Sequence, residues 1–435
     1  MHRSQWSRVG SYLKSSLWVV PLIAIPLGMI TTRMLHWLDG QLAWTLTGFT
    51  ATGLGLAGFS MTGARALLDA VITSTLSFVV FTFGSLLVAI QVASGQMTPR
   101  IIATVLLRNN VVRYTVGLFI FTLMLSLGTH GRLDEKLHPL PVIAASCLGI
   151  ACFAAFLYLI DYASRLLRPI SVLTHVANSG FAVIESVYPE PSLGPNVPSH
   201  RHDLGPAERV ILHHGTSGIV LTVDQAALIR SAAALNGIIE LVPQVGDFVG
   251  VDEPLFKLYG GAHAANDETL RSAIECGSER TLEQDPTFAF RIVIDIALKA
   301  LSPAINDPTT AVLAIDQLHR LLRLVGKRHL RTDEISDATG LQLVIFPTPN
   351  WEDFVHLSFS ELRQCGGDKL QIVRRLRAMI ENLIQTLPSH RQPALQQQLS
   401  LLDREVTRLF EYPEELALAR VGDSQGLGGR SSRSN

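Results

Sequence analysis

The chain has 435 residues, of which 48% are hydrophobic and 17% are charged. Soluble globular proteins carry about 25% charged residues, so this composition favours a membrane protein and excludes intrinsic disorder for most of the chain. The 36 basic and 37 acidic residues leave a formal net charge of −1, which excludes the strongly basic balance typical of a nucleic-acid-binding protein.

Four apolar segments in the first 165 residues are long enough to cross a bilayer, which requires about 20 apolar residues per helix. They cover residues 17–38, 66–93, 111–128 and 140–160. Basic residues cluster before the first segment, after the second and after the fourth, so four crossings place all of these residues on the cytoplasmic side. We therefore expect both termini to be cytoplasmic and the Gly- and Thr-rich segment 42–61 to be an extracytoplasmic loop.

The rest of the chain has the composition of a soluble α+β domain. After the transmembrane domain (1–165), we expect a juxtamembrane connection and Pro-rich linker (166–209), a small β-rich subdomain (210–262) and a mostly helical subdomain (263–420). The alternating run at 218–223 predicts a strand in the β-rich part. The Gly- and Ser-rich tail at 421–435 is predicted to be disordered.

Two Asp-Pro-Thr sequences mark helix starts in the helical subdomain. Asp285 and Asp307 are placed as N-caps, each with proline at the first helical position, which predicts helices at 287–301 and 309–325. A strand pair is predicted at 341–346 and 354–359, followed by amphipathic helices at 369–387 and 393–410. The apolar positions of the last helix repeat every 4 and 3 residues over two heptads. That pattern fits packing against the preceding helix or assembly with another subunit.

Two stretches of the chain resemble signatures of a known family. Residues 84–100 (GSLLVAIQVASGQMTPR) resemble the membrane signature of the bacterial DUF2254 predicted membrane proteins. Residues 279–281 (ERT), 284–288 (QDPTF) and 295–308 (DIALKALSPAINDP) resemble the second signature of that family, with Ala304 where glycine is usual. The resemblance covers nearly the whole chain and implies four spans, a cytoplasmic domain and a bacterial inner-membrane location. The activity of the family is uncharacterised, so the resemblance implies no mechanism.

Small and polar residues form one stripe along the second apolar segment. At 100° per residue the stripe falls within about 40° of arc, and it consists of Thr73, Ser77, Gly84, Gln91 and Gly95. One interpretation is a close-packed helix interface, because small residues let helix backbones approach each other. The other is an aqueous path lined by Ser77 and Gln91, because polar side chains at membrane depth face protein or water.

Three arginines follow this segment at the expected cytoplasmic face: Arg100, Arg108 and Arg113. They fit a role as topology determinants that contact lipid headgroups. Around a pore, they would instead form a positive vestibule that favours anions.

One polar cluster in the helical subdomain is either structural or a ligand site with Arg280 as an anion contact. It consists of Glu279, Arg280, Asp295, Asn306 and Asp307. No nucleophile–base set, phosphate loop or metal-binding spacing is recognisable, so we expect no enzyme, no metal and no cofactor.

The sequence therefore predicts an α-helical membrane domain with four transmembrane helices, followed by an α+β cytoplasmic domain. The functional hypothesis is a homo-oligomeric channel or transport-like protein for an ion or small solute, since four spans with one polar stripe cannot enclose a wide path alone. The alternative is a membrane-anchored sensor or scaffold that signals through its cytoplasmic domain. Its expected partners are the lipid bilayer and further copies of the chain.

Overall fold

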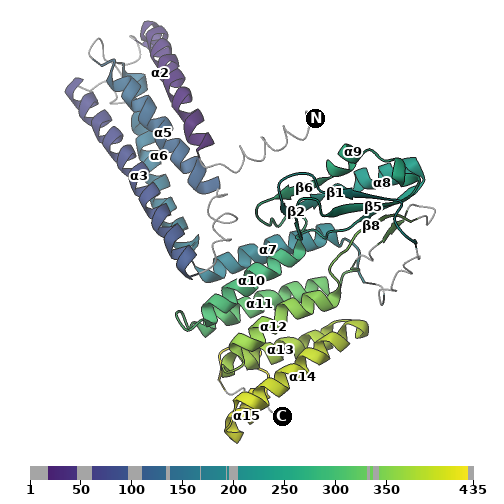
Figure 1. Cartoon of the computed structure of the whole chain (residues 1–435). Coiled ribbons are helices and arrows are strands. Elements are labelled where there is room, and N and C mark those ends of the chain that lie inside the picture. Colours follow the sequence, from purple (N-terminus) through teal and green to yellow (C-terminus); the bar gives the residue numbers. More distant parts are fainter. Residues whose placement is uncertain are drawn as a thin grey trace. The chain divides into compact units, whose positions relative to one another are not determined.

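A computed structural model describes residues 18–46, 61–96, 110–133, 138–166, 168–192, 194, 204–330, 334–336 and 342–429 of the chain. The chain divides into two compact units, an N-terminal unit Met1–Val172 and a C-terminal unit Leu173–Asn435. Helices alone form the described part of the first unit, and helices and strands form the second (Figure 1).

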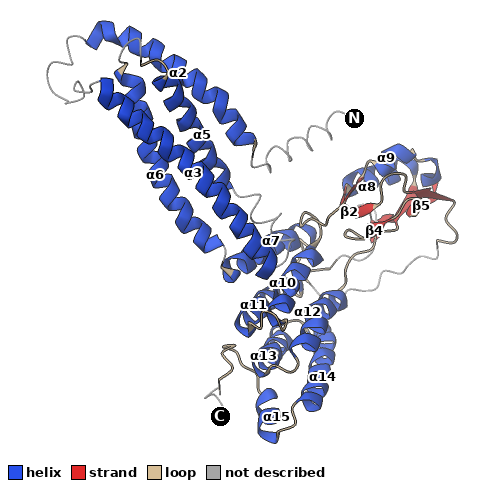
Figure 2. Ribbon diagram, turned by 60° about the vertical axis from the view of Figure 1, so that its left-hand side comes forward, coloured by secondary structure: helices blue, strands red, loops and turns tan. Residues whose placement is uncertain are grey.

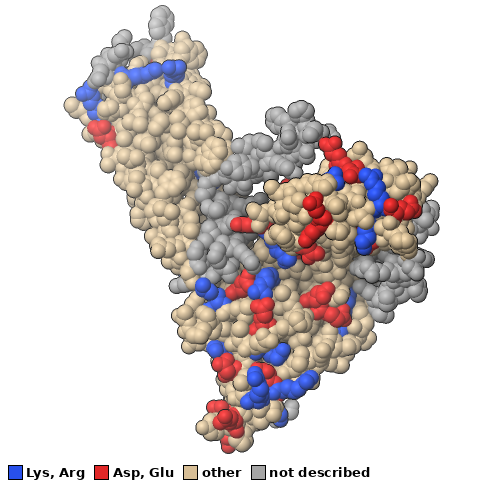
Figure 3. All heavy atoms as spheres, viewed as in Figure 1, with Lys and Arg blue, Asp and Glu red and all other residues tan. Residues whose placement is uncertain are grey.

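Four long helices form the N-terminal unit, at the positions of the four predicted spans. They are α2 (Val19–Leu46), α3 (Met61–Gln96), α5 (Asn110–His130) and α6 (Pro139–Leu166). Helix α5 packs against the other three helices (Figure 2). In Figure 3, the broad middle of the visible face of the N-terminal unit carries no Lys, Arg, Asp or Glu. A surface in contact with lipid requires such an absence of charge. Most of the predicted loop at 42–61, namely residues 47–60, lies outside the described residues.

Glycines allow the helices of this unit to approach closely. A Cβ at Gly117 of α5 would lie 2.6 Å from Cγ1 of Val20, and one at Gly149 of α6 would lie 2.8 Å from Cγ2 of Val71. Small residues of this kind drive helix association where lipid removes the hydrophobic driving force. At these two positions, the side chain of one helix therefore packs directly against the glycine backbone of its neighbour.

Two His–Asp pairs join the helices of this unit. The Nδ1 atom of His138 lies 2.9 Å from Oδ2 of Asp39, and Oδ1 of Asp39 accepts a hydrogen bond from the backbone of Leu140. The Nε2 atom of His130 lies 3.1 Å from Oδ1 of Asp69. Each pair thereby connects helices that are far apart in the sequence.

A fifth helix, α7 (Pro169–Val187), is also long and apolar enough to cross a membrane, so the described residues contain five candidate spans where the sequence predicts four. The sequence predicts a juxtamembrane connection and linker over this range, at 166–209. From Leu173 onward α7 belongs to the C-terminal unit. A Cβ at Gly180 would lie 2.7 Å from Cβ of Ala289 and 3.0 Å from Cδ2 of Leu321, so this helix packs against the helical core of that unit.

Two small sheets form the β-rich part of the C-terminal unit. One has the strand order β1-β5-β3-β8-β7 and the other β4-β2-β6; β3 and β8 are parallel, and all other pairs are antiparallel. The elements are β1 (Arg209–Leu212), β2 (Gly218–Val223), α8 (Gln225–Leu235), β3 (Gly237–Leu241), β4 (Phe248–Val249), β5 (Pro254–Gly260), η3 (Gly261–Ala264), α9 (Asp267–Arg271), β6 (Ile274–Gly277), β7 (Glu334–Ser336) and β8 (Gln342–Ile345). Strands β7 and β8 come from the range predicted to be mostly helical, so the chain returns to complete the first sheet.

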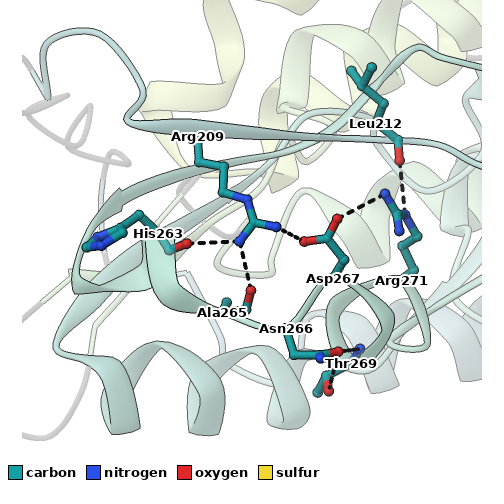
Figure 4. Close-up of polar contacts among 8 residues, drawn as sticks. All are labelled: Arg209, Leu212, His263, Ala265, Asn266, Asp267, Thr269 and Arg271. Carbon is teal, nitrogen blue, oxygen red and sulfur yellow. Dashed lines mark hydrogen bonds and ion pairs between the residues drawn. The ribbon is translucent and has the colours of Figure 1, made fainter.

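A carboxylate shared by two arginines fastens α9 to strand β1 (Figure 4). Asp267 accepts from Arg209 through Oδ1 and from Arg271 through Oδ2, the latter at 3.3 Å. Arg209 also donates to the carbonyls of His263 and Ala265, at 2.9 and 3.0 Å. These bonds satisfy backbone acceptors that the short 3₁₀ segment η3 leaves unpaired.

Helices form the remainder of the C-terminal unit. They are α10 (Pro286–Leu301), α11 (Pro308–Val325), α12 (Trp351–Gly366), α13 (Leu370–Thr386), η4 (Ser389–Arg391), α14 (Gln392–Leu409) and α15 (Pro413–Ala419). Both predicted N-caps are confirmed, because Asp285 Oδ1 accepts from the Phe288 amide and Asp307 Oδ1 from the Thr310 amide. In α14, Leu395, Leu402 and Val406 are buried and the helix packs against α13 and α12, whereas Leu399 is half-buried and Leu409 is exposed. The heptad face therefore packs within the chain only in part.

The predicted strand at 354–359 is wrong, because these residues lie in α12. A reciprocal capping box starts that helix: Asn350 Oδ1 accepts from the Asp353 amide and Asp353 Oδ2 accepts from the Asn350 amide, both at 2.9 Å. The apolar residues of the segment then follow helical spacing, which buries Trp351, Phe354 and Phe359 on one face.

The tail predicted to be disordered is ordered over residues 421–429. Arg374 of α13 is fully buried and donates to the carbonyls of Val421, Gly428 and Gly429. Asp423 in turn accepts from three tail amides, at 2.8–3.0 Å. A buried guanidinium requires acceptors, and the tail carbonyls supply them for Nε and Nη1 of Arg374.

Candidate functional site

The residues of the predicted stripe share one exposed face of α3. Thr73, Ser77, Gly84, Gln91 and Gly95 are all exposed in the N-terminal unit. A Cβ placed at Gly84 or Gly95 would meet no atom within 4 Å. The structure therefore brings these residues together, but on the outside of the unit, where α2, α5 and α6 do not cover them.

The stripe is centred on the uncharged part of α3. Asp69 and Arg100 are the charges that bound the uncharged residues 70–99, whose midpoint lies beside Gly84. Ser77 and Gln91 are each seven residues from Gly84, or about 10.5 Å along a helix axis. Both positions fall within the half-thickness of about 15 Å of a bilayer core centred there.

Ser77 and Gln91 differ in how their polar groups are satisfied. The Ser77 hydroxyl donates to the carbonyl of Thr73 at 2.7 Å, which satisfies it within the helix. The Gln91 amide makes no hydrogen bond with any of the described residues. Because lipid offers neither donors nor acceptors, an amide at this depth requires contact with protein or water.

The opposite face of α3 is packed within the unit. Ala64, Leu68, Thr75, Thr82 and Ala89 are buried there. The Thr75 and Thr82 hydroxyls donate to carbonyls one turn earlier, both at 2.7 Å, so these polar side chains are satisfied while buried. Helix α3 thus packs one face against the other described helices of the unit. Its opposite face, at 77, 84 and 91, is exposed.

One of the three predicted vestibule arginines lies among the described residues. Arg113, in the first turn of α5, donates to Oδ1 of Asn110 at 2.8 Å, and its guanidinium lies 5.1 Å from the Tyr114 ring centre. Arg100 and Arg108 lie outside the described residues. The arrangement at Arg113 is that of a cation held near an aromatic ring at a helix start.

The predicted polar cluster of the C-terminal unit is divided among separate places. Asp295 forms an ion pair with Arg291 at 2.7 Å on the side of α10. Asp307 caps α11, and Asn306 before it takes the left-handed conformation with φ 48°. The two ends of α10 are about 24 Å apart, since it has 16 residues with a 1.5 Å rise. Glu279 is exposed, and the cluster does not form one site.

Arg280 instead belongs to a junction at the start of α10, in which Gly246 and Asp285 are buried and Arg280 itself is exposed. Its Nη2 atom donates to the Gly246 carbonyl at 2.6 Å, and Nη1 lies 3.6 Å from Oδ2 of Asp285. The Asp285 side chain is only 4% exposed. Burial raises the pKa of the Asp285 carboxyl, although the hydrogen bond from Thr287 and the charge of Arg280 oppose that shift. This junction ties the turn after β3 to the helical part.

The sequence predicts Asp285 as an N-cap alone and indicates no role for Gln284. In the structure Gln284 Oε1 accepts from the Val223 amide at 2.9 Å, which connects α10 to the end of β2. The sequence feature that could have indicated a role for both residues is their place in the QDPTF stretch, which resembles the family signature. Within the described residues, no group of three or more His, Cys, Asp or Glu side chains has the arrangement of a metal site.

Long apolar helices followed by a mixed helix-and-strand unit define the class of this chain as a multi-span helical membrane protein. The family model described as "Predicted membrane protein (DUF2254)" matches residues 14–382, and the chain belongs to this family.

Two similar proteins are uncharacterised proteins of Mycobacterium bovis and Mycobacterium tuberculosis. Each is 25% identical over 420 residues, which cover 94% of this chain and 79% of the relative. No solved structure matches the chain. The comparisons thus support membrane location and family membership.

Proposed function

We propose that the chain is a subunit of a homo-oligomeric channel or transport-like protein of the bacterial inner membrane. In this assembly the exposed faces of α3 from several copies surround a path for an ion or small solute. Both termini and the C-terminal unit are cytoplasmic, where that unit assembles or gates the channel.

The observation that supports this proposal is the exposed amide of Gln91 on a membrane helix, which has no hydrogen-bond partner among the described residues. Inside one copy the bundle is closed by direct helix contacts, as at Gly117 and Gly149, so a path through a single chain has no room there. Gly84 leaves space for the backbone of another helix to approach. Val80 and Leu87 are exposed on the same face and supply apolar contact between copies.

The positive residues at the cytoplasmic end extend the proposal to selectivity. Arg100, Arg108 and Arg113 would give the mouth of the path a positive potential that favours anions. An Arg100→Glu variant is then expected to shift permeability towards cations. Unchanged selectivity would leave these arginines as lipid and topology contacts.

The experiment is ion flux from liposomes that contain the purified chain, beside a Gln91→Leu variant and empty vesicles. An Ile150→Leu variant is the control, because Ile150 of α6 is 72% exposed on another helix of the same unit. We expect flux above background that changes in Gln91→Leu and not in Ile150→Leu. Absence of flux across several ions and voltages, with the oligomer intact, would contradict the channel.

The second function that fits the same stripe is a sensor or scaffold, in which the α3 faces pack dry against each other. The back-bonded Ser77 favours it, because a hydroxyl satisfied within its own helix does not require water. In that case the oligomer forms but carries no flux, and the C-terminal unit binds the partner or ligand. The flux experiment separates these two outcomes.

A further inference from the structure

The C-terminal unit contains a cavity of about 530 Å³ that no part of the proposed membrane path uses. This volume lies within the range of about 300–1,000 Å³ typical of small-molecule sites. Its walls come from five separate stretches of the chain: the end of α7, the start of α8, the turn after β3, the start of α10 and the Pro-rich segment after β8. A cavity assembled from so many segments is a property of the folded unit, not of one loop.

The cavity lies just beyond the carboxyl ends of three strands. Thr222 and Val223 end β2, Gln244 follows β3, and Phe346 follows β8 directly. Strands β3 and β8 are parallel, so their carboxyl ends meet at the same edge of the sheet. In open α/β sheets, ligands commonly bind in the crevice outside the carboxyl ends of the strands.

The helix starts at this cavity do not form an anion site. Asp224 caps α8 and accepts from the Ala227 amide at 2.9 Å, and Asp285 caps α10 and accepts from the Phe288 amide at 3.1 Å. Pro286 at the first position of α10 has no N–H to donate. The caps therefore use part of the first-turn donors and place negative charge where an anion would bind.

The charged groups of the wall favour a cation. Asp224 and Asp285 are the charged residues among those that line the cavity. Asp285 is buried and paired with Arg280, whereas Asp224 is exposed. Asp224 uses Oδ1 for the cap, and its Oδ2 has no partner within the described part of the chain. Among the described residues that line the cavity, a ligand therefore meets one available carboxylate oxygen and no cationic side chain.

We propose that this cavity binds a small organic cation that carries an amidinium or primary ammonium group. The charged group lies against Asp224, and the apolar part of the ligand lies against Phe346 and Pro347. Glutamine amides at 225, 244 and 284 supply further polar groups on the wall. The site goes beyond the proposed channel, since it depends only on the C-terminal unit.

The test is calorimetric titration of the full-length chain in detergent with three probes of one shape and different charge: benzamidinium, benzamide and benzoate. We expect saturable binding of benzamidinium that is at least about tenfold tighter than that of benzoate. Absence of saturable benzamidinium binding, or equal binding of benzoate, would overturn the proposal.

Matched variants assign the binding to the cavity. Asp224→Asn retains the N-cap, because Asn caps helices as well as Asp, and it is expected to weaken benzamidinium about tenfold while leaving benzamide unchanged. Asp252→Asn removes an exposed carboxylate outside the cavity and is expected to change nothing. Ala226→Phe places bulk at the cavity wall and is expected to abolish binding of benzamidinium and benzamide. Unchanged benzamidinium affinity in Asp224→Asn or Ala226→Phe, with an unaltered unfolding midpoint, would overturn the assignment.

Discussion

The guanidinium of Arg280 donates a 2.6 Å hydrogen bond to the carbonyl of Gly246, and this bond joins the β-rich and helical parts of the C-terminal unit. Gly246 has φ +95°, a conformation that side-chain-bearing residues rarely adopt. A Cβ there would also lie 2.7 Å from Oδ2 of Asp285. Backbone conformation and close approach thus both require glycine at this position.

Replacing Gly246 with alanine is expected to destabilise the chain by about 2–3 kcal/mol, since strain and steric overlap add. Gly205→Ala is the control, because Gly205 has φ +68° but open space around its Cβ. It is expected to cost about 1 kcal/mol from strain alone. Thermal unfolding midpoints of the two variants measure the difference. Equal midpoints would contradict a role for the contact with Asp285.

Replacing Asp285 with asparagine is expected to alter the pH dependence of stability. Burial raises the pKa of this carboxyl, so the folded chain holds its proton more tightly than the unfolded chain. The contribution of the Asp285 carboxyl to the free energy of unfolding is therefore fully present below the pKa of the unfolded chain, about 3.9. It falls as pH rises from that value through the raised pKa of the folded chain. Asparagine keeps the cap and removes this fall, so the variant gains stability relative to wild type as pH rises.

The measurement for Asp285 is the difference between wild-type and variant unfolding midpoints across that pH window. Asp307→Asn, at the N-cap of α11, is the matched control, because the Asp307 carboxylate is only half-buried. A difference for Asp285→Asn that stays constant with pH would show that burial does not control its titration.

The Asp423 carboxyl is expected to contribute to stability with the opposite sign. Burial acts against its charge, but hydrogen bonds from the amides of Gly428, Gln425 and Gly426 outweigh burial and lower its pKa. Its stabilisation is present above the unfolded pKa of about 3.9 and is lost as pH falls through the lowered folded value. Asp423→Asn should therefore lower the midpoint at neutral pH and approach wild type in acid. A variant that follows the wild-type profile would contradict the role of these amides.

Arg374→Met is expected to release the tail and to destabilise the chain by about 3 kcal/mol, because several charge-assisted hydrogen bonds are lost. Exchange of the amide hydrogens of residues 421–429 with deuterium checks this outcome directly. The control is Arg404→Met, at an exposed position of α14. Slow exchange of the tail in the Arg374 variant would show that other contacts hold it.

The elements that the sequence predicted well have strong local signals. The four apolar segments, the strand Gly218–Val223 and the two Asp-Pro helix starts all appear where expected. The strand predicted at 354–359 failed because short apolar runs fit either period, and the capping box at Asn350 decides for helix. The ordered tail was missed because its partner, Arg374, is nearly 50 residues away in sequence.

The candidate sites also depend on contacts between distant parts of the chain, which local sequence patterns do not predict. The spacing of Ser77, Gly84 and Gln91 predicted one face of α3, but only the packing of the other helices shows that this face is the uncovered one. The polar cluster around Arg280 was grouped by sequence proximity, which a helix of 16 residues separates into distant ends. The cavity beside Asp224 is built from five stretches, and no local pattern joins them.

The proposed channel requires the α3 stripe to contact water and to face other copies of the chain. The most direct measurement is the reactivity of single cysteines at 77 and 91 with a water-borne thiol reagent in membranes, after the four native cysteines are replaced. Cysteines at Ile150, exposed on α6, and at Thr82, buried on the opposite side of α3, are the controls. We expect the cysteines at 77 and 91 to react and both controls to remain protected. Protection at 77 and 91 equal to that at 82 would contradict an aqueous path along α3.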